Sequence, residues 1–546
     1  MITGLCAPMR RLAVVAGLPL VLLLSTAVPA FADSESTGAD VVVAQTLGDR
    51  ELTVVLRRVT SVPGPLSVDI ITHTGTAPGR LALTVTPTGT TSAAPGSSAP
   101  GTPTAEATVE LGAHAGSYSA TVPVDRPGPW ELALGDGQRT ARIPFAVTKQ
   151  VISPPERLAY GGLIAAGALL LVSGVLAARV RRAGWALVPA GGALAALSVA
   201  VTAALLSSSL PLPPQPGSQI DPTVDHVGDP YALNKPLITD YSRPPVMLTL
   251  QSTPVVAGNA ADVGLELSDG STGLPVDDLL VHDDALIHLL VVGPTGQLWH
   301  LHPIRTAPGH YRQHLLLPVS GHYAVSAEMV RRGGGVQMVR AVAGVNAVAV
   351  SRPGPSTIEP VGPMNPVHLD SSSLSATTAV GSARVSLTTT RPVAGMPVTV
   401  AARVGDTADL QAWLGMVGHM IVAGPLPPTN TNDIGTAVQS APVWAHAHSM
   451  GGMPASDHSM AGMAMTNATG TANNSMDAMI AMNPVNGDSA PDETVAGYGP
   501  DVPLTFTFPA AGQYRLWVQI ERNYTLLTVP VAIDVVDGSA VQGMQP

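Results

Sequence analysis

Short runs in which hydrophobic and polar residues alternate recur along most of the chain, separated by turns rich in glycine and proline. A strand with one buried face has this period of two, so the pattern predicts antiparallel β-structure. Three segments open alike, with a strand, a glycine-bearing turn and a second strand: LTVVLRRVTSVPGPLSVDI (52–70), VMLTLQSTPVVAGNAADVGLEL (246–267) and RVSLTTTRPVAGMPVTVAARV (384–404). Their closing strands also match. We therefore predict a mainly β protein with three antiparallel β-sandwich domains that arose by duplication.

Two uninterrupted apolar runs break this alternation: LAYGGLIAAGALLLVSGVLAA (158–178) and GWALVPAGGALAALSVAVTAALLSSSL (184–210). Each is long enough to cross a bilayer as a helix, and neither carries a charge. The loop between them holds Arg179, Arg181 and Arg182, and positive loops stay on the cytoplasmic side. We therefore predict a two-helix transmembrane hairpin in the cell membrane, with the bulk of the chain extracytoplasmic. The alternative is a buried helical pair in a soluble domain.

The N-terminus has the pattern of a signal peptide, which we place at 1–32. Arg10 and Arg11 precede the apolar run LAVVAGLPLVLLL (12–24), and small residues precede a cleavage site. An uncleaved anchor helix is the alternative. The single cysteine, Cys6, lies inside this segment. A cleaved chain would therefore have no disulfide, thiolate metal site or cysteine nucleophile.

Proline-rich stretches divide the rest of the chain. The predicted organisation is a β-sandwich at 38–150, the two helices at 157–210, a linker at 211–240, a His-rich β-sandwich at 241–350, a linker at 351–383, and a β-sandwich at 384–538 with an insertion at about 425–500. The formal net charge is −11. That charge argues against a nucleic-acid partner and suits the attraction of cations.

The second and third segments share a histidine pattern that the first lacks. DALIHLLVVGPTGQLWHLHP (284–303), and LGMVGHMIVAGP (414–425) with VWAHAHSM (443–450), each carry a histidine, apolar residues, Gly-Pro and a later His-x-His. Imidazole is a common metal ligand, so the repeat predicts two metal sites, one in each segment. Buried histidines bonded only to backbone are the alternative. The matched pairs are His288 with His419, His300 with His446, and His302 with His448.

The turn PTG (294–296) suits a three-residue hairpin loop with a left-handed glycine. This register pairs Gly293 with Gln297 and places His288 opposite His302. All three imidazoles of the segment then share one face of the sheet. A two-residue loop would turn His288 to the other face. In the first segment His73 and His114 stand alone, and we assign them no catalytic role.

A tract rich in histidine and methionine follows the last His-x-His: HAHSMGGMPASDHSMAGMAM (446–465). Thioether selects Cu(I), whereas imidazole accepts Cu(II), zinc or nickel. The absence of carboxylate clusters favours copper over calcium or magnesium, with zinc less expected. A linker with flexible apolar methionines is the alternative. The predicted metal ligands are His288, His300, His302, His419, His446, His448, Met450, Met453, His458, Met460 and Met463.

HSMGGM and DHSMAGM resemble the His/Met-rich tracts of bacterial periplasmic copper-resistance proteins. The first histidine hairpin, together with GHYAVSAEMVRRGGGVQ (321–337), resembles secreted YtkA/FixH-like and cupredoxin-like β-sandwich proteins of bacteria. The resemblance covers most of 246–345 and 384–535. It implies an immunoglobulin/cupredoxin-like fold and copper handling in the envelope. The chain departs from blue-copper proteins and multicopper oxidases, whose sites need a cysteine.

Three functions remain open at this point. We expect a membrane-anchored extracytoplasmic copper-binding protein, not an enzyme, for copper sequestration, delivery or resistance, with another envelope metal-handling protein as its partner. A copper-dependent oxidoreductase is the second hypothesis, and it would need an open coordination position. An envelope interaction or adhesion protein without metal is the third. Such a protein would tolerate alanine at all six matched histidines.

Overall fold

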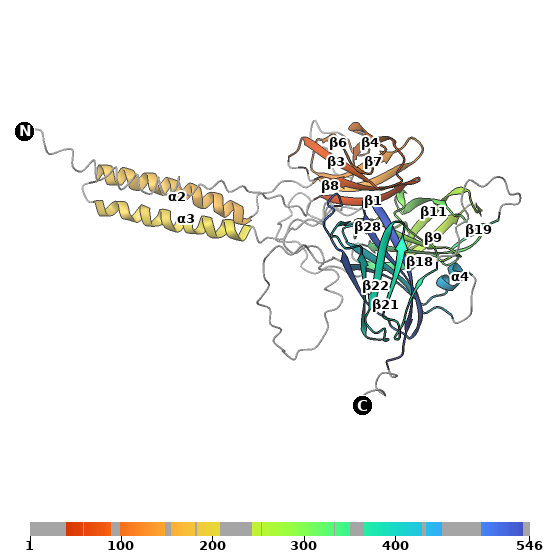
Figure 1. Ribbon diagram of the computed structural model, residues 1–546. Coiled ribbons are helices and arrows are strands. Elements are labelled where there is room, and N and C mark those ends of the chain that lie inside the picture. Colours follow the sequence, from red (N-terminus) through yellow and green to blue (C-terminus); the bar gives the residue numbers. More distant parts are fainter. Residues whose placement is uncertain are drawn as a thin grey trace, which may run out of the picture.

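The structure is a computed structural model that describes residues 40–147, 154–207, 243–349, 365–449 and 493–538, apart from 58, 60, 89–98, 181–182, 253, 332–333 and 428–432. Strands make up most of these residues, and two long helices lie apart from them (Figure 1). The predicted signal peptide falls outside the described residues.

The first region, residues 41–147, forms two four-stranded antiparallel sheets. Every second residue of strand β4 is buried, so that Leu81, Leu83 and Val85 enter the core. One sheet has the order β1 (Val41–Leu47), β2 (Arg50–Leu56), β3 (Gly64–Thr72), β6 (Gly116–Val124). The other has the order β5 (Ala105–Leu111), β4 (Gly79–Pro87), β7 (Gly128–Gly135), β8 (Thr140–Val147).

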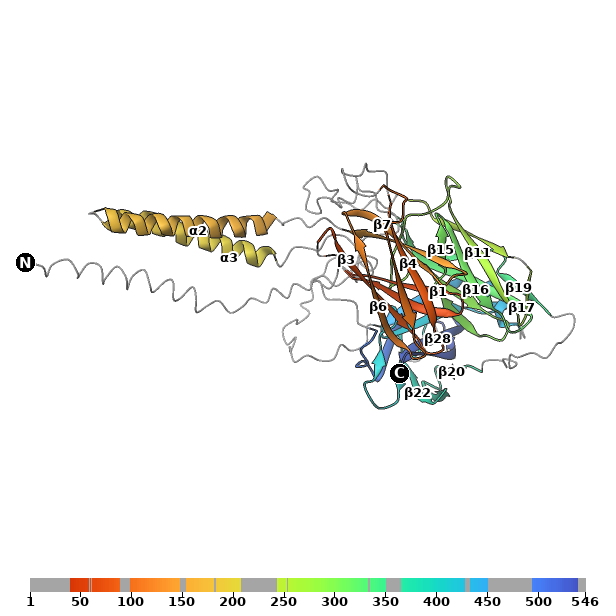
Figure 2. The same cartoon turned by 90° about the horizontal axis from the view of Figure 1, so that it is seen from above.

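The two helices, α2 (Pro154–Arg179) and α3 (Leu187–Ser207), are joined through the short helix η2 (Ala183–Ala186). Both are long and apolar enough to cross a membrane. They pack closely at Gly162, where a Cβ atom would lie only 2.7 Å from the carbonyl oxygen of Ala196. Small residues permit such an approach between apolar helices. Figure 2 shows the pair extending away from the strands.

The second region, residues 246–348, also has two sheets. One follows the order β10 (Val255–Val256), β19 (Val345–Val348), β17 (Gly321–Arg331), β13 (His288–Val292), β14 (Leu298–Leu301), with β12 (Leu279–Leu280) and β18 (Gly335–Arg340) also paired to β17. The other follows β15 (Ile304–Ala307), β16 (His310–Leu316), β11 (Ala260–Asp269), β9 (Val246–Ser252). The pairs are antiparallel except for the short parallel pair β10–β19.

The third region, residues 367–535, repeats this plan. One sheet follows β20 (Val367–Leu369), β29 (Thr525–Val535), β28 (Gly512–Arg522), β25 (Gly418–Gly424), β26 (Val443–Ser449), with β24 (Leu410–Gln411) on β28. The other follows β21 (Ser375–Val380), β22 (Ala383–Thr389), β23 (Pro397–Val404), β27 (Asp501–Thr507). Strands β20 and β21 lie within the predicted linker at 351–383, so the region begins before 384. β20 pairs with β29 in parallel.

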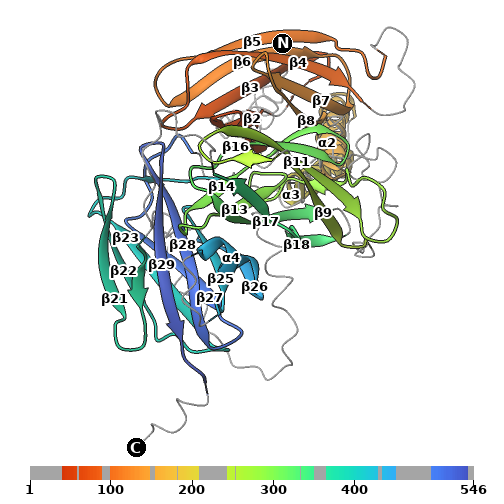
Figure 3. The ribbon, with the colours of Figure 1, turned by 90° about the vertical axis from the view of Figure 1, so that its right-hand side faces the viewer.

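The second and third regions pack against one another through equivalent sheets. Leu290 on β13, and Ile421 and Trp517 on β25 and β28, are fully buried in one shared apolar cluster. Helix α4 (Ile434–Gln439) contributes Val438 to the same cluster. Figure 3 shows the first region beside this pair. The three β regions therefore contact one another, and the histidine-bearing strands lie at this junction.

Candidate metal centre

The hairpin β13–β14 has the register that the sequence predicted. The backbone N–H of Gly293 donates to the carbonyl of Gln297 at 2.9 Å. Further along the ladder Leu290 pairs with His300. Directly paired residues point to the same side of a sheet, so His288, two residues before Leu290, lies on the histidine face.

The hairpin β25–β26 repeats this arrangement in the third region. His419 pairs with His448, and Ile421 pairs with His446. A longer connection that contains helix α4 replaces the three-residue turn, yet the register of the histidines is the same. The matched pairs inferred from the sequence therefore occupy equivalent positions in the two sheets.

The long strand beside each hairpin adds a polar residue to the same face. Glu328 on β17 lies opposite His288. Gln519 on β28 lies opposite His419 in the same way. Both side chains are buried, and each reaches across to a histidine of the other region.

The two histidine faces meet, so the six matched histidines form one cluster. Ring centroids of His300 and His446 are 5.0 Å apart, and those of His288 and His446 are 5.4 Å apart. The nitrogens of His288, His300 and His446 lie within 4.8 Å of one another, as do those of His419, His446 and His448. The two expected ligand sets therefore adjoin one another. His446 joins both groups because the sheets pack face to face, a contact that a strand pattern does not report.

Outer hydrogen bonds fix which nitrogen of His288 and His300 carries the hydrogen. Nε2 of His288 lies 3.0 Å from the carbonyl oxygen of His282, and Nδ1 of His300 lies 2.9 Å from Oε1 of Gln519. Both oxygens only accept, so both N–H groups point outward. The inward atoms, Nδ1 of His288 and Nε2 of His300, are 3.1 Å apart. In neutral rings these atoms are two facing lone pairs with no hydrogen between them.

His419 and His446 show the same geometry. Nε2 of His419 donates to the carbonyl oxygen of Trp413 at 2.8 Å, and Nδ1 of His446 lies 2.7 Å from Oε2 of Glu328. When Glu328 is a carboxylate, the inward nitrogens of the two rings are again facing lone pairs, 3.0 Å apart. Two imidazole ligands of a tetrahedral ion, each about 2.0–2.1 Å from it, are separated by roughly 3.3 Å. Both pairs therefore fit a bound metal ion.

The two remaining histidines leave Nε2 without a hydrogen bond among the described residues. Nε2 of His302 and Nε2 of His448 are both buried. Nδ1 of His302 contacts the carboxylate of Glu51. Nε2 of His448 lies 3.4 Å from a carboxylate oxygen of Asp283. A buried nitrogen without a partner costs free energy, and a metal ion would remove that cost.

Burial keeps five of the six histidines uncharged. Desolvation, together with the neighbouring imidazoles, holds the pKa of His288, His300 and His446 well below the usual value. Desolvation also lowers the pKa of His419 and His448 to about 3. Neutral imidazole is the form that binds metal, so near neutral pH protons do not compete for the inward nitrogens.

Burial has the opposite effect on the acids around the cluster. It raises the pKa of Glu328 to about 8, with a contribution from the charge of Asp283. It also raises the pKa of Asp283 itself. A cation bound to the adjacent imidazoles would stabilise the charged form of both carboxylates.

The first region contributes to the surroundings of His302. The N–H of Thr46 donates to the carbonyl of His302 at 2.7 Å, and the N–H of His302 donates to the Thr46 hydroxyl at 2.8 Å. The same hydroxyl donates to Glu51 at 2.7 Å. The first region thus orients one imidazole of the cluster, a role that its sequence did not indicate.

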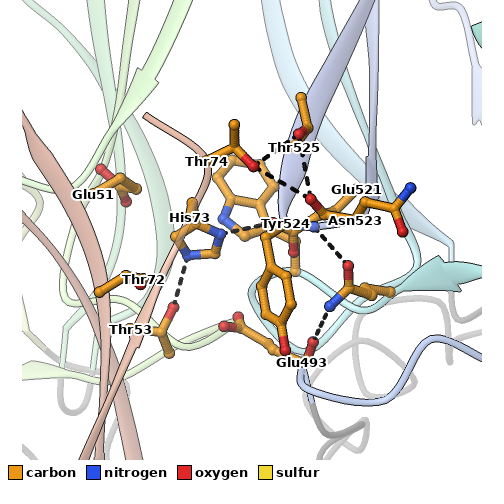
Figure 4. A network of polar contacts seen from close by, with 12 residues as sticks. Glu51, Thr53, Thr72, His73, Thr74, Glu493, Glu521, Asn523, Tyr524 and Thr525 are labelled. Atoms are coloured by element: carbon orange, nitrogen blue, oxygen red, sulfur yellow. Dashed lines mark hydrogen bonds and ion pairs between the residues drawn. The ribbon is translucent and has the colours of Figure 1, made fainter. Parts of the chain in front are cut away.

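The first region also docks on the turn between β28 and β29 (Figure 4). Nδ1 of His73 lies 2.6 Å from Oε1 of Glu521, and the N–H of Thr74 donates to the carbonyl of Tyr524 at 2.7 Å. Desolvation alone would lower the pKa of His73, but the hydrogen bond and charge of Glu521 outweigh it and raise the pKa to about 9. The expectation that His73 stands alone was wrong, because its partner lies in a distant segment.

The structure brings together all six matched histidines, whereas the other predicted ligands, Met450, Met453, His458, Met460 and Met463, lie outside the described residues. Glu51, Glu328 and Gln519 were not predicted from the sequence. The shared closing strands of the second and third segments carry Glu328 and Gln519 at equivalent positions, so that repeat held a signal for both. No local pattern marks Glu51.

No family model and no curated protein matches the chain. Among solved structures, it is similar to a protein described as membrane anchored from Corynebacterium diphtheriae, with 9% identity, 89% of this chain and 92% of the other covered, and a TM-score of 0.14. A tandem repeat from a large adhesion protein has 11% identity, covers 90% of this chain and 82% of its own, and scores 0.14. The integrin-binding protein invasin has 9% identity and a TM-score of 0.13, and the match covers 91% of this chain and 60% of invasin. Such scores carry no argument about function.

Proposed function

We propose that the chain is a membrane-anchored extracytoplasmic copper-binding protein whose histidine cluster receives the metal. The supporting observation is the pair of inward nitrogen contacts, His288 with His300 at 3.1 Å and His419 with His446 at 3.0 Å. Histidines kept only for packing would place a hydrogen atom in such a contact. The His288–His300 contact, and the His419–His446 contact while Glu328 is ionised, are facing lone pairs, which a cation between them would stabilise.

Copper is the metal that the donors of the whole segment favour. The cluster offers neutral imidazole, which accepts Cu(II), Cu(I) and zinc. The tract that begins directly after Ser449 adds methionine thioethers, which select Cu(I). We propose that the tract captures copper and passes it to the cluster, because β26 leads from His446 and His448 straight into it. Zinc is the competing cargo.

The helices α2 and α3 anchor the chain in the cell membrane in this proposal. The arginines of the loop between them keep that loop cytoplasmic and leave all three β regions outside. We further propose that these regions are duplicated immunoglobulin/cupredoxin-like sandwiches, of which the second and third share the histidine hairpin. The role is copper sequestration, delivery or resistance without catalysis, with another envelope metal-handling protein as donor or acceptor.

The test is a copper titration of the full chain in detergent beside the variant H300L/H446L. Leucine removes one nitrogen of each facing pair and keeps the site filled and apolar. We expect tight Cu(II) and Cu(I) binding in the parent chain, at least tenfold weaker binding in the variant, and a lower thermal midpoint, because buried Gln519 and Glu328 each lose a hydrogen-bond partner. H368A, at an exposed position on β20, is the matched control and should bind as the parent does.

Two outcomes would overturn the proposal. Equal copper affinity in H300L/H446L and the parent chain would show that the cluster does not bind copper. If the chain prefers zinc in a competition titration with copper, zinc would replace copper as the proposed cargo. A second variant, with Met450, Met453, Met460 and Met463 changed to leucine, measures the tract separately, and we expect it to slow Cu(I) uptake while the cluster keeps its Cu(II) affinity.

A further inference from the structure

We propose that the histidine cluster is a dinuclear centre, which holds one metal ion against each pair of facing nitrogens. This inference rests on the proposed function and adds the number and arrangement of the ions. It starts from the near symmetry of the two regions: His288 faces His300 at 3.1 Å, and His419 faces His446 at 3.0 Å. The first contact is a pair of facing lone pairs and the second is one while Glu328 is ionised, so each contact can hold one cation.

The hydrogen bonds leave one inward nitrogen per ring, and six such nitrogens do not surround one ion. In each facing pair, the other ring nitrogen is bound to a carbonyl, amide or carboxylate oxygen. Among the described residues, the nitrogens that lie within 4.8 Å of one another fall into groups of three. Three imidazoles are a sufficient protein ligand set for one ion that keeps an open position.

His446 determines how the histidine nitrogens are divided between the two ions. Its Nδ1 is held by Glu328, so only Nε2 is free to bind, and it can serve one ion. With His419 and His448 it forms a group whose nitrogens already lie within 4.8 Å. His288 and His300 then need a third donor from their own region.

In this centre His302, which lies outside the two 4.8 Å groups, moves in as the third donor when the ion binds. Its Nε2 is buried and has no hydrogen bond among the described residues. Its ring centroid lies 5.4 Å from that of His288 and 5.3 Å from that of His300. The Thr46 hydroxyl fixes its backbone, and Glu51 holds its Nδ1, which leaves Nε2 as the nitrogen available to a metal.

Acidic side chains are distributed to balance two positive charges. Glu51 contacts His302 on one side of the cluster. Glu328 and Asp283 contact His446 and His448 on the other. Cations buried among neutral imidazoles need such compensation, because desolvation of an unpaired charge is costly. The acids on both sides therefore match an ion on each side.

The experiment counts bound Cu(II) per full-length chain in detergent by equilibrium dialysis and records the EPR signal at each ratio. The background variant carries leucine at Met450, Met453, Met460 and Met463 and alanine at His458, so that the predicted ligands of the tract are not counted. We expect two ions per chain. The ring centroids of His300 and His446 are 5.0 Å apart, so the ions lie close enough to couple, and the integrated signal per copper falls as the second ion binds.

Variants that remove one half at a time complete the test. In the same background, H300L and H446L should each bind one copper with its full EPR signal. One ion in the parent, or loss of all copper in either variant, would overturn the dinuclear centre while leaving a copper site. Two ions with undiminished signal would place the second ion elsewhere and also overturn it. No copper at all would refute the proposed function itself.

Discussion

The second and third regions build their halves of the cluster in the same way but surround them differently. In both, a carbonyl six residues earlier holds the first histidine. The second histidine is held by an amide oxygen of Gln519 in one half and by a carboxylate oxygen of Glu328 in the other. Each of these side chains comes from the opposite region. The inner geometry is thus the same in both halves, and neither half is complete without the other.

The difference between Gln519 and Glu328 makes the two halves chemically unequal. The amide oxygen of Gln519 fixes the tautomer of His300 and adds no charge. The carboxylate of Glu328 makes His446 more basic and offsets the charge of a cation. Burial raises the pKa of Glu328 to about 8, which a bound metal ion would counter. We therefore expect the half built on the third region to bind its ion more tightly.

Separating the two halves should have the largest effect. Trp517 is fully buried between the regions, and its indole N–H donates to the carbonyl of Gly296 at 2.9 Å. W517A should lower the free energy of unfolding by about 3–5 kcal/mol and abolish metal binding by both halves. W517F keeps most of the apolar contact and should cost about 1 kcal/mol. Denaturant titration measures the free energy of unfolding of both variants. Equal losses of stability in W517A and W517F would show that apolar packing at this position is unimportant.

The attachment of the first region to the third should depend on pH. The pKa of His73 is about 9 in the folded chain, above its unfolded value. The ion pair with Glu521 therefore contributes its full stability below about pH 6.5 and loses it as the pH rises through about 9. The size of this contribution is about 3 kcal/mol. E521Q should remove the dependence in that range, as followed by thermal midpoints from pH 6 to 10. An unchanged slope would contradict the ion pair.

Exchanging the two outer partners should make the halves more alike. E328Q keeps a hydrogen-bond acceptor on His446 but removes the charge, and it should weaken metal binding by the third-region half by about 10–100-fold. Q519E should strengthen binding by the second-region half. Competition titrations on each variant give the two affinities. If E328Q leaves them unchanged, the halves differ for another reason.

The sequence predicts local geometry well and contacts between regions poorly. The loop at 294–296 was enough to place His288 and the His-x-His motif on one face, because the turn of a short hairpin fixes its register. Leu290 and Ile421 share one apolar cluster although their strands lie far apart in the sequence. An alternating pattern predicts that one face of a strand is buried but does not predict which segment covers that face. The roles of Glu51 and His73 were missed for this reason. The strands β20 and β21 were missed because the predicted linker was extended from the proline-rich run 351–366 up to the matching strand at 384.

The smallest effect is expected at Thr46, which links the first region to only one half. T46V keeps the shape and strand preference of the side chain but removes the hydroxyl that accepts from the N–H of His302 and donates to Glu51. It should cost about 1 kcal/mol of stability and weaken the second-region half more than the third, because the third has no contact with Thr46. T84V, a half-buried position on β4, is the matched control. Equal weakening of both halves would mean that the first region stabilises the cluster as a whole and does not orient His302 individually.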